Sequence, residues 1–109
     1  MTQITKEDGF TIVSPQGKLD TISAPAFSNE LSTLLSQDIK ACIIDLSEVT
    51  FLSSSGLQAL LVGAKISKSS GIKYEVCGMS EMVNDVFCLS GFDSFIDTFT
   101  TKEDALNSL

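Results

Sequence analysis

The sequence contains no histidine, no arginine and no tryptophan among its 109 residues. Without histidine, the chain cannot build a Ser-His-Asp or Cys-His catalytic centre, carry a phosphohistidine or hold a metal through imidazole. Without arginine, it has no bidentate guanidinium clamp for a phosphate or carboxylate group. Catalysis would have to rely on Asp, Glu, Lys, Ser, Cys or Tyr, which leaves few of the common enzyme mechanisms open.

Positive charge is also scarce. Seven lysines stand against fourteen acidic residues, which gives a formal net charge of −7. Such a surface repels phosphate backbones, so we expect no nucleic-acid partner. Apolar residues make up 43% of the chain, enough to form a core, and the length fits one domain. We therefore expect a single domain over residues 1–109.

Long apolar runs are absent as well. No run approaches the ~18 residues that a membrane helix needs, and residues 1–8 lack the apolar region of a secretory signal, so we expect neither a membrane nor an export role. The three cysteines, Cys42, Cys77 and Cys88, form no Cys-x-x-Cys pair. Each lies in an apolar stretch, which predicts buried, reduced thiols in a cytoplasmic protein without a metal.

Strand-like and helix-like segments alternate along the chain. Strands are predicted at residues 2–6, 10–13, 41–46, 72–77 and 95–99, with a short resumption of the second strand at 18–19. Helices are predicted to follow Ser23, the serine triplet Ser53–Ser55, Ser80 and Thr101. Asp8-Gly9 is typical of a hairpin turn. This order predicts an α/β fold whose mixed, mostly parallel sheet opens with an N-terminal antiparallel hairpin and carries helices packed on it.

Apolar residues at helical spacing predict the inward face of three helices. These stripes are Phe27, Leu31, Leu34 and Leu35, then Leu57, Leu60, Leu61 and Ala64, then Met82, Val83, Val86 and Leu89. Ser55 and Gln58 have capping-box spacing, and Gly91 suits the end of the third helix. We also expect Met79, Phe92 and Phe95 to pack in the core.

The most distinctive segment is 45–57, with the sequence Asp-Leu-Ser-Glu-Val-Thr-Phe-Leu-Ser-Ser-Ser-Gly-Leu. It leads from a buried strand to a helix start, where free N–H groups and the positive end of the helix dipole are exposed. One serine of the triplet would suffice as a cap. The alternative to capping is phosphorylation, because a phosphate adds ~1.5–2 negative charges that a helix start stabilises.

This segment resembles the signature of STAS-domain anti-sigma factor antagonists, D-L-S-x-V followed by F-[ML]-D-S-[ST]-G-L. The matching residues are Asp45-Leu46-Ser47-x-Val49 and Phe51-Leu52-x-Ser54-Ser55-Gly56-Leu57. Upstream, Gly17-Lys18-Leu19-Asp20 and Ala24-Pro25 are similar to the family's G-x-L-D…A-P element. The resemblance covers nearly the whole chain, and it implies a single STAS domain that binds rather than catalyses. It departs at position 53, where family members usually have Asp.

The resemblance implies a phosphorylation site at Ser54, with Ser53 and Ser55 as weaker candidates. It implies a partner surface made of Asp20, Ser53, Ser54, Ser55, Gly56 and Leu57. The unphosphorylated protein would capture an anti-sigma factor, a serine kinase that binds ATP, and so release a sigma factor. Phosphorylation would end that capture and a PP2C-type phosphatase would restore it, with no cofactor bound by this chain.

Three alternatives stay open. The first is a STAS scaffold subunit of a lipid-transport or stress-signalling complex. It stays open because Ser53 stands where family members usually have Asp. The second is a receiver-like protein phosphorylated on Asp45, although Asp45 equally suits a cap on the loop that follows its strand. The third is a small flavodoxin-like enzyme or flavin carrier, for which no phosphate-binding loop is visible. Ser70 and Lys73 have the spacing of the Ser-x-x-Lys catalytic motif, but the chain lacks the motifs that accompany it in enzymes, so we take this match as chance.

Overall fold

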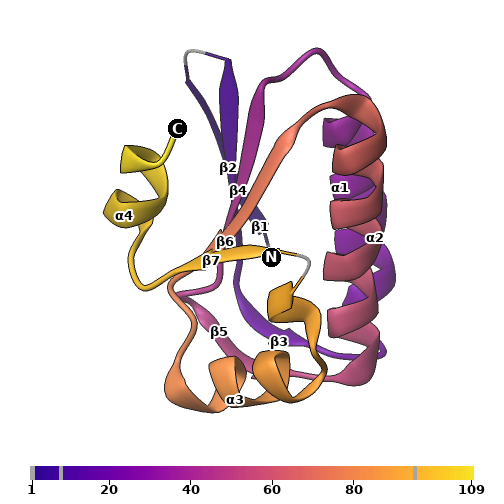
Figure 1. Ribbon diagram of the computed structural model, residues 1–109. Coiled ribbons are helices and arrows are strands. Elements are labelled where there is room, and N and C mark those ends of the chain that lie inside the picture. Colours follow the sequence, from indigo (N-terminus) through magenta and orange to yellow (C-terminus); the bar gives the residue numbers. More distant parts are fainter. Residues whose placement is uncertain (1, 8, 95) are drawn as a thin grey trace.

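The computed structural model describes residues 2–7, 9–94 and 96–109. The strands are β1 (Thr2–Glu7), β2 (Phe10–Pro15), β3 (Gly17–Leu19), β4 (Ala41–Asp45), β5 (Val49–Leu52), β6 (Lys73–Cys77) and β7 (Asp97–Phe99). The helices are α1 (Ala24–Leu35), α2 (Ser54–Ser70), α3 (Glu81–Leu89) and α4 (Lys102–Asn107), with a short 3-10 turn, η1, at Phe92–Ser94. Figure 1 shows the sheet between the α1–α2 pair on one side and α4 on the other.

The main sheet has five strands in the order β1-β2-β4-β6-β7. β1 pairs with β2 in antiparallel register, and the other neighbours are parallel, which confirms the predicted mixed α/β sheet. Gly9 has a positive φ in the hairpin turn, and Asp8 lies outside the described residues. β4 is the central strand, and the neighbouring Ile43 and Ile44 are both fully buried. This confirms the prediction, made from the apolar run at 41–46, of a central strand covered on both faces.

A second, two-stranded sheet was not predicted. The strand at 18–19 is confirmed as β3, but it pairs in parallel with β5 and does not continue the main sheet. β5 was missed because the chain was expected to pass directly from the central strand to the α2 helix. Only its end residues, Val49 and Leu52, are buried, so its four residues show neither alternation nor a continuous apolar run.

The core has two unequal parts. The larger cluster lies between the sheet and helices α1, α2 and α3, and it includes the predicted α1 stripe of Phe27, Leu31, Leu34 and Leu35. The smaller cluster lies under α4 and contains Ile12, Ile43, Cys77 and Ala105. None of the helices in the described part of the chain is both long enough and apolar enough to span a membrane.

The predicted inward face of α3 was partly wrong. Val83 is buried as expected, but Met82 is 62% exposed and Leu89 is 87% exposed. α3 packs through Val83 and Phe87, one turn apart, because its main neighbours are β5 and η1 on a single side. Phe92 packs edge-on against Phe87 with ring centroids 6.3 Å apart, as a core role requires. The same prediction for Phe95 lies outside the described residues.

The predicted alternation of exposed and buried residues along β6 was also wrong at Glu75. This carboxylate is fully buried because β4 and β7 flank its strand and α4 covers it. Lys73 Nζ lies 3.5 Å from Glu75 Oε2, and the Ser108 hydroxyl donates a hydrogen bond to the same oxygen. A buried charge needs such partners, so Glu75 ties the end of α4 to the sheet.

Candidate functional site

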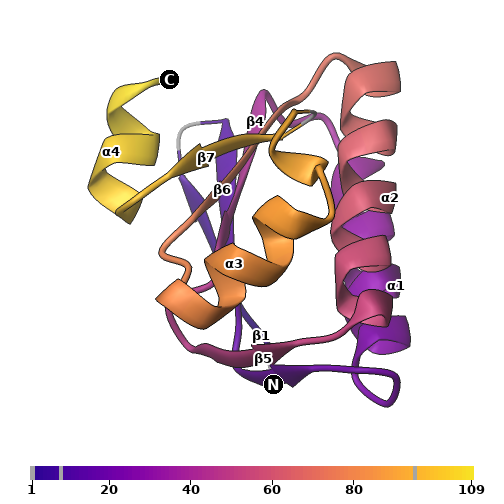
Figure 2. The ribbon, with the colours of Figure 1, turned by 60° about the horizontal axis from the view of Figure 1, so that its bottom comes forward.

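The serine triplet lies where β5 passes into α2, beside the turn that joins β3 to α1. Figure 2 shows β3 and β5 running together below the main sheet, toward the starts of the two helices. The ladder between these short strands places two segments more than thirty residues apart side by side, with Leu19 opposite Leu52. The two motifs that carried the family resemblance therefore form one continuous site.

Ser53 is the N-cap of α2. Its hydroxyl accepts a hydrogen bond from the Gly56 N–H at 3.2 Å and donates one to the Leu19 carbonyl at 3.1 Å. The Ser53 N–H donates to the same carbonyl at 2.9 Å. The predicted capping box at Ser55 and Gln58 was therefore wrong, because the cap lies two residues earlier and the helix begins inside the triplet.

Ser54 is the first helical residue of α2, and its side chain is exposed. Within the part of the chain that is described, its hydroxyl makes no hydrogen bond. Ser55 differs, since it is half-buried and its hydroxyl lies 3.5 Å from that of Thr21. Of the three hydroxyls, that of Ser54 is the one most open to another molecule.

Gly56 and Leu57 lie on the inner side of this helix start. A Cβ added at Gly56 would come within 2.6 Å of the Leu19 carbonyl oxygen and 2.9 Å of the Leu52 side chain. Leu57 is part of the main core. The sequence placed both residues on the partner surface, but the structure buries them because α2 sits directly on the β3–β5 ladder. Both residues hold the helix start against the ladder, directly after the serines in the sequence.

Asp20 organises the neighbouring turn. Its Oδ1 accepts hydrogen bonds from the N–H groups of Ile22 and Ser23, at 3.0 and 3.1 Å. The pKa of Asp20 is lowered, chiefly by the hydrogen bond from the Ser23 backbone. Ser23 is the N-cap residue of α1 as predicted, but its hydroxyl makes no capping bond and instead donates to the Lys18 carbonyl. The Leu19 carbonyl, directly before Asp20, accepts both hydrogen bonds from Ser53. The Asp20 turn therefore lies next to the serine triplet.

The electrostatic setting of the α2 start is unlike that of the following helices. The first turn of α2 contains no acidic residue, whereas α3 has Glu81 there, and α4 has Glu103 and Asp104. The positive end of the α2 dipole is thus left without a carboxylate from its own first turn. An anionic group on Ser54 would occupy that place.

A shallow hollow of about 370 Å³ lies between the first halves of α1 and α2. Pro25, Ser28, Ser55 and Val62 are among the residues that line it. In the β3–α1 turn, next in sequence to Thr21, which lines the hollow, the Ile22 side chain is 90% exposed. Apolar surface therefore adjoins the serines, as a protein-docking surface requires.

The other candidate groups have structural roles. Asp45 Oδ1 accepts a hydrogen bond from the Ser47 N–H at 3.1 Å, so it caps the loop after β4. Burial raises the pKa values of the Cys42 and Cys77 thiols to about 12, which keeps both protonated and unreactive. Cys88, which was predicted to be buried, is exposed near the end of α3. The described residues contain no cluster of acidic and cysteine side chains that could hold a metal.

The mixed sheet, the β3–β5 ladder and the capped serine helix start define a small α/β domain of STAS type. A family profile for the STAS domain matches residues 1–105, and the chain belongs to this family, whose relatives include anti-sigma factor antagonists.

Among these relatives is the anti-sigma-F factor antagonist RsfB of Mycobacterium tuberculosis. It is 30% identical over 107 residues, which cover 97% of this chain and 86% of RsfB. A crystal structure of an anti-sigma factor antagonist from Mycobacterium paratuberculosis superposes with a TM-score of 0.90 at 29% identity, covering 99% of this chain and 92% of that one. The Bacillus cell fate determinant SpoIIAA, in its phosphorylated form, shares the fold with a TM-score of 0.76 at 19% identity, over 99% and 98% of the two chains.

Proposed function

We propose that this protein is an anti-sigma factor antagonist that is controlled by phosphorylation of Ser54. In its unphosphorylated state it binds an anti-sigma factor, a serine kinase that holds ATP, and so releases a sigma factor. Phosphorylation of Ser54 ends the binding, and a PP2C-type phosphatase restores it. The protein acts by binding, in the cytoplasm, and the nucleotide belongs to the partner.

The choice of Ser54 rests on the different hydrogen bonding of the three serine hydroxyls. The Ser53 hydroxyl is engaged both as acceptor and as donor, so a kinase could use it only by dismantling the cap. The Ser55 hydroxyl is turned toward Thr21. Ser54 is exposed at the first position of the helix, where its modification leaves both of these contacts in place.

The departure at position 53 fits the same proposal. Asp and Ser are both strong N-cap residues, because each offers a side-chain oxygen to the N–H groups of the first turn. Ser53 therefore keeps the cap and removes one negative charge beside Ser54. That loss of charge makes the helix start more receptive to a phosphate, so the substitution does not by itself favour a scaffold role without a phosphorylation switch.

A docking surface that includes Ser54 explains how the phosphate would act. The partner would cover the hollow between α1 and α2 together with the exposed Ile22 and Val62. Covering Ser54 in the same interface would strip water from a doubly charged phosphate. A buried charge without a counter-charge costs several kcal/mol, and ~3 kcal/mol corresponds to more than a hundredfold in affinity.

The test is a titration of the anti-sigma factor kinase with the unmodified and the Ser54-phosphorylated protein. We expect phosphorylation to lower the affinity at least tenfold. Ser54→Ala should stay folded, bind like the unmodified protein and resist inactivation by kinase and ATP. Ser55→Ala is the matched control, and it should still be inactivated. Equal affinities of the modified and unmodified forms would contradict the proposal.

The co-purifying partner separates this function from the scaffold alternative. A kinase recovered with the unmodified protein supports the proposal, whereas a transporter ATPase or a scaffold protein would favour the alternative. A phosphate that resists neutral hydroxylamine supports serine, and a hydroxylamine-labile label on Asp45 would favour the receiver-like alternative.

A further inference from the structure

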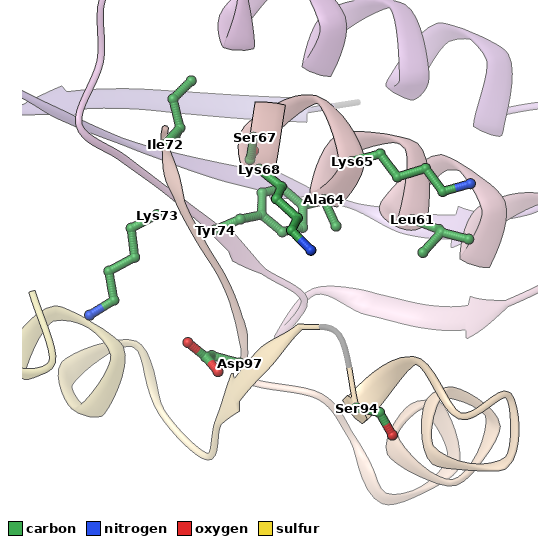
Figure 3. A pocket seen from close by; sticks show the side chains of 10 residues that line it. All are labelled: Leu61, Ala64, Lys65, Ser67, Lys68, Ile72, Lys73, Tyr74, Ser94 and Asp97. Atoms are coloured by element: carbon green, nitrogen blue, oxygen red, sulfur yellow. The ribbon is translucent and has the colours of Figure 1, made fainter. Parts of the chain in front are cut away.

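A cavity lies at the other end of α2 from the serine triplet. It has a volume of about 710 Å³ and is bounded by the second half of α2, the start of β6, and the η1–β7 region (Figure 3). From Ser54 to Lys68 the helix rises ~21 Å, at 1.5 Å per residue. The cavity is therefore separate from the proposed phosphorylation site, and nothing in the proposed function uses it.

The walls of the cavity combine an apolar floor with a buried polar group. Leu61, Ala64, Ile72 and the ring of Tyr74 supply the floor. Ser67 also lines the cavity, is 1% exposed, and has a hydroxyl without a hydrogen-bond partner among the described residues. A buried hydroxyl of this kind is costly to leave unpaired, so it marks a place where a ligand atom would gain a hydrogen bond.

The charge around the cavity is opposite to that of the protein as a whole. Three of the seven lysines line it, although the net charge of the chain is −7. Lys73 donates a hydrogen bond to the Ser108 carbonyl and forms an ion pair with Glu75, so its charge is already balanced by a carboxylate of the chain. Lys65 and Lys68 form no ion pair within the described ranges, and Figure 3 shows the Lys68 amino group extending toward the space between α2 and β7. Asp97 is the acidic residue on the opposite wall.

We propose that this cavity binds a small amphipathic anion, a carboxylate carried on an aliphatic body. Its head group would lie beside Ser67 and Lys68, with the Ser67 hydroxyl as hydrogen-bond donor and the Lys68 ammonium as the nearer counter-charge, while Lys65 adds positive charge farther along α2. Its body would cover the floor formed by Leu61, Ala64 and Tyr74. A concave site with an apolar lining and a few convergent polar groups is the usual form of a small-molecule site, and its volume falls in the common range.

The experiment uses decanoate as the probe and the full chain labelled with nitrogen-15. We expect saturable binding of one decanoate, with the largest amide shifts at Ser67, Lys68 and Tyr74. Decanol, which has the same chain without the charge, should bind at least tenfold more weakly. Raising the salt concentration should weaken decanoate binding and leave decanol binding unchanged.

Paired charge reversals test the head group. Lys65→Glu with Lys68→Glu should weaken decanoate binding at least tenfold. The matched control, Lys18→Glu with Lys102→Glu, changes the net charge equally at exposed positions away from the cavity and should leave binding intact. Ser67→Ala should weaken binding about threefold without lowering the melting temperature, since it removes a hydroxyl that has no partner in the folded chain. Dispersed spectra establish that each variant is folded.

Three results would overturn the proposal. The first is a titration that does not saturate. The second is a pattern of shifts centred outside the cavity. The third is equal loss of binding in the two charge-reversed pairs, which would mean that decanoate responds only to the net charge. Failure of this site would leave the proposed role of Ser54 untouched, because the two sites share no residue.

Discussion

α2 and α3 both begin at a serine N-cap, yet they differ in what surrounds that cap. In each helix the cap hydroxyl accepts a hydrogen bond from the N–H group three residues on, Gly56 in α2 and Val83 in α3. The next residue is Glu81 in α3, which already places a carboxylate at the positive helix end. In α2 the next residue is the neutral, exposed Ser54. The comparison separates two features of a helix start: both helices have a cap that satisfies a first-turn N–H group, and of the two only α3 has a carboxylate in its first turn.

The two helix starts also differ in how closely they pack. α2 rests on the β3–β5 ladder through Gly56, where no side chain fits, whereas α3 places the larger Val83 at the equivalent position. The cap of α2 also reaches outside its own helix to the Leu19 carbonyl. The start of α2, where Ser54 lies, is therefore tied to the β3–β5 ladder by closer contacts than those at the start of α3.

Gly56→Ala should produce the largest change. The added methyl would clash with the Leu19 backbone, so α2 would have to move or the ladder open, and we expect a loss of ~2–3 kcal/mol in the free energy of unfolding. Urea denaturation measures it. Gln58→Ala, at an exposed position in the next turn, is the control and should change stability by no more than ~0.5 kcal/mol. A Gly56→Ala protein of unchanged stability would show that the close contact does not hold the helix start.

The two caps should rank next. Ser53→Ala and Ser80→Ala should each cost ~1 kcal/mol of folding stability, and Ser53→Ala should cost more of the two because the Leu19 carbonyl also loses a donor. Ser54→Ala should stay within ~0.5 kcal/mol of the unmodified protein, since its hydroxyl has no partner in the described structure. If Ser54→Ala were as damaging as Ser53→Ala, Ser54 would be a structural residue.

A smaller effect is expected from charge in the first turn. Ser54→Asp should raise stability by ~0.3–1 kcal/mol at low salt, because it supplies the carboxylate that α2 lacks. Glu81→Gln should lower stability by a similar amount, since it removes that carboxylate from α3. Thermal unfolding at low and high salt measures both changes, and salt should shrink both. Opposite signs at the two helix starts are the expected result, and equal signs would refute the difference between them.

The smallest effect concerns pH and the Asp20 turn. The pKa of Asp20 is lowered in the folded chain, mainly by the Ser23 backbone hydrogen bond. Its contribution to stability is therefore present above the unfolded-state pKa, ~4, and is lost as the pH falls through the lower folded value. Asp20→Asn should lower stability slightly at neutral pH, where the charged carboxylate contributes, and by less at low pH, so the stability profile flattens in that acidic range. An unchanged acidic slope in this variant would show that Asp20 does not carry it.

The sequence predicted the strands and helices of the main sheet because their apolar patterns are strong. The run at 41–46 and the α1 stripe each bury most of their apolar atoms against several neighbours. Prediction from the sequence failed where tertiary contacts determine whether a segment forms a strand or a residue is buried. β5 is too short to show a period, Glu75 is covered by a helix distant in sequence, and the exposed Met82 and Leu89 have the same spacing as core residues.

The site shows the same division between local and tertiary information. The serine triplet stood out in the sequence, but which serine caps α2 depends on the Leu19 carbonyl, which comes from a strand more than thirty residues away. Likewise, the burial of Gly56 and Leu57 depends on the β3–β5 ladder, which no local pattern predicted. The sequence therefore indicated the candidate site, and the fold shows which of its residues form the cap, which are exposed and which are buried.

The most direct test of the central claim is a phosphopeptide map of residues 45–65. The protein would be isolated intact from cells that make it, with phosphatases inhibited, and each serine of the triplet would be scored separately. We predict phosphate on Ser54, varying with growth conditions, while Ser53 and Ser55 stay unmodified. Phosphate on Ser53, or an unmodified triplet under every condition, would contradict the assignment of Ser54 as the regulated residue.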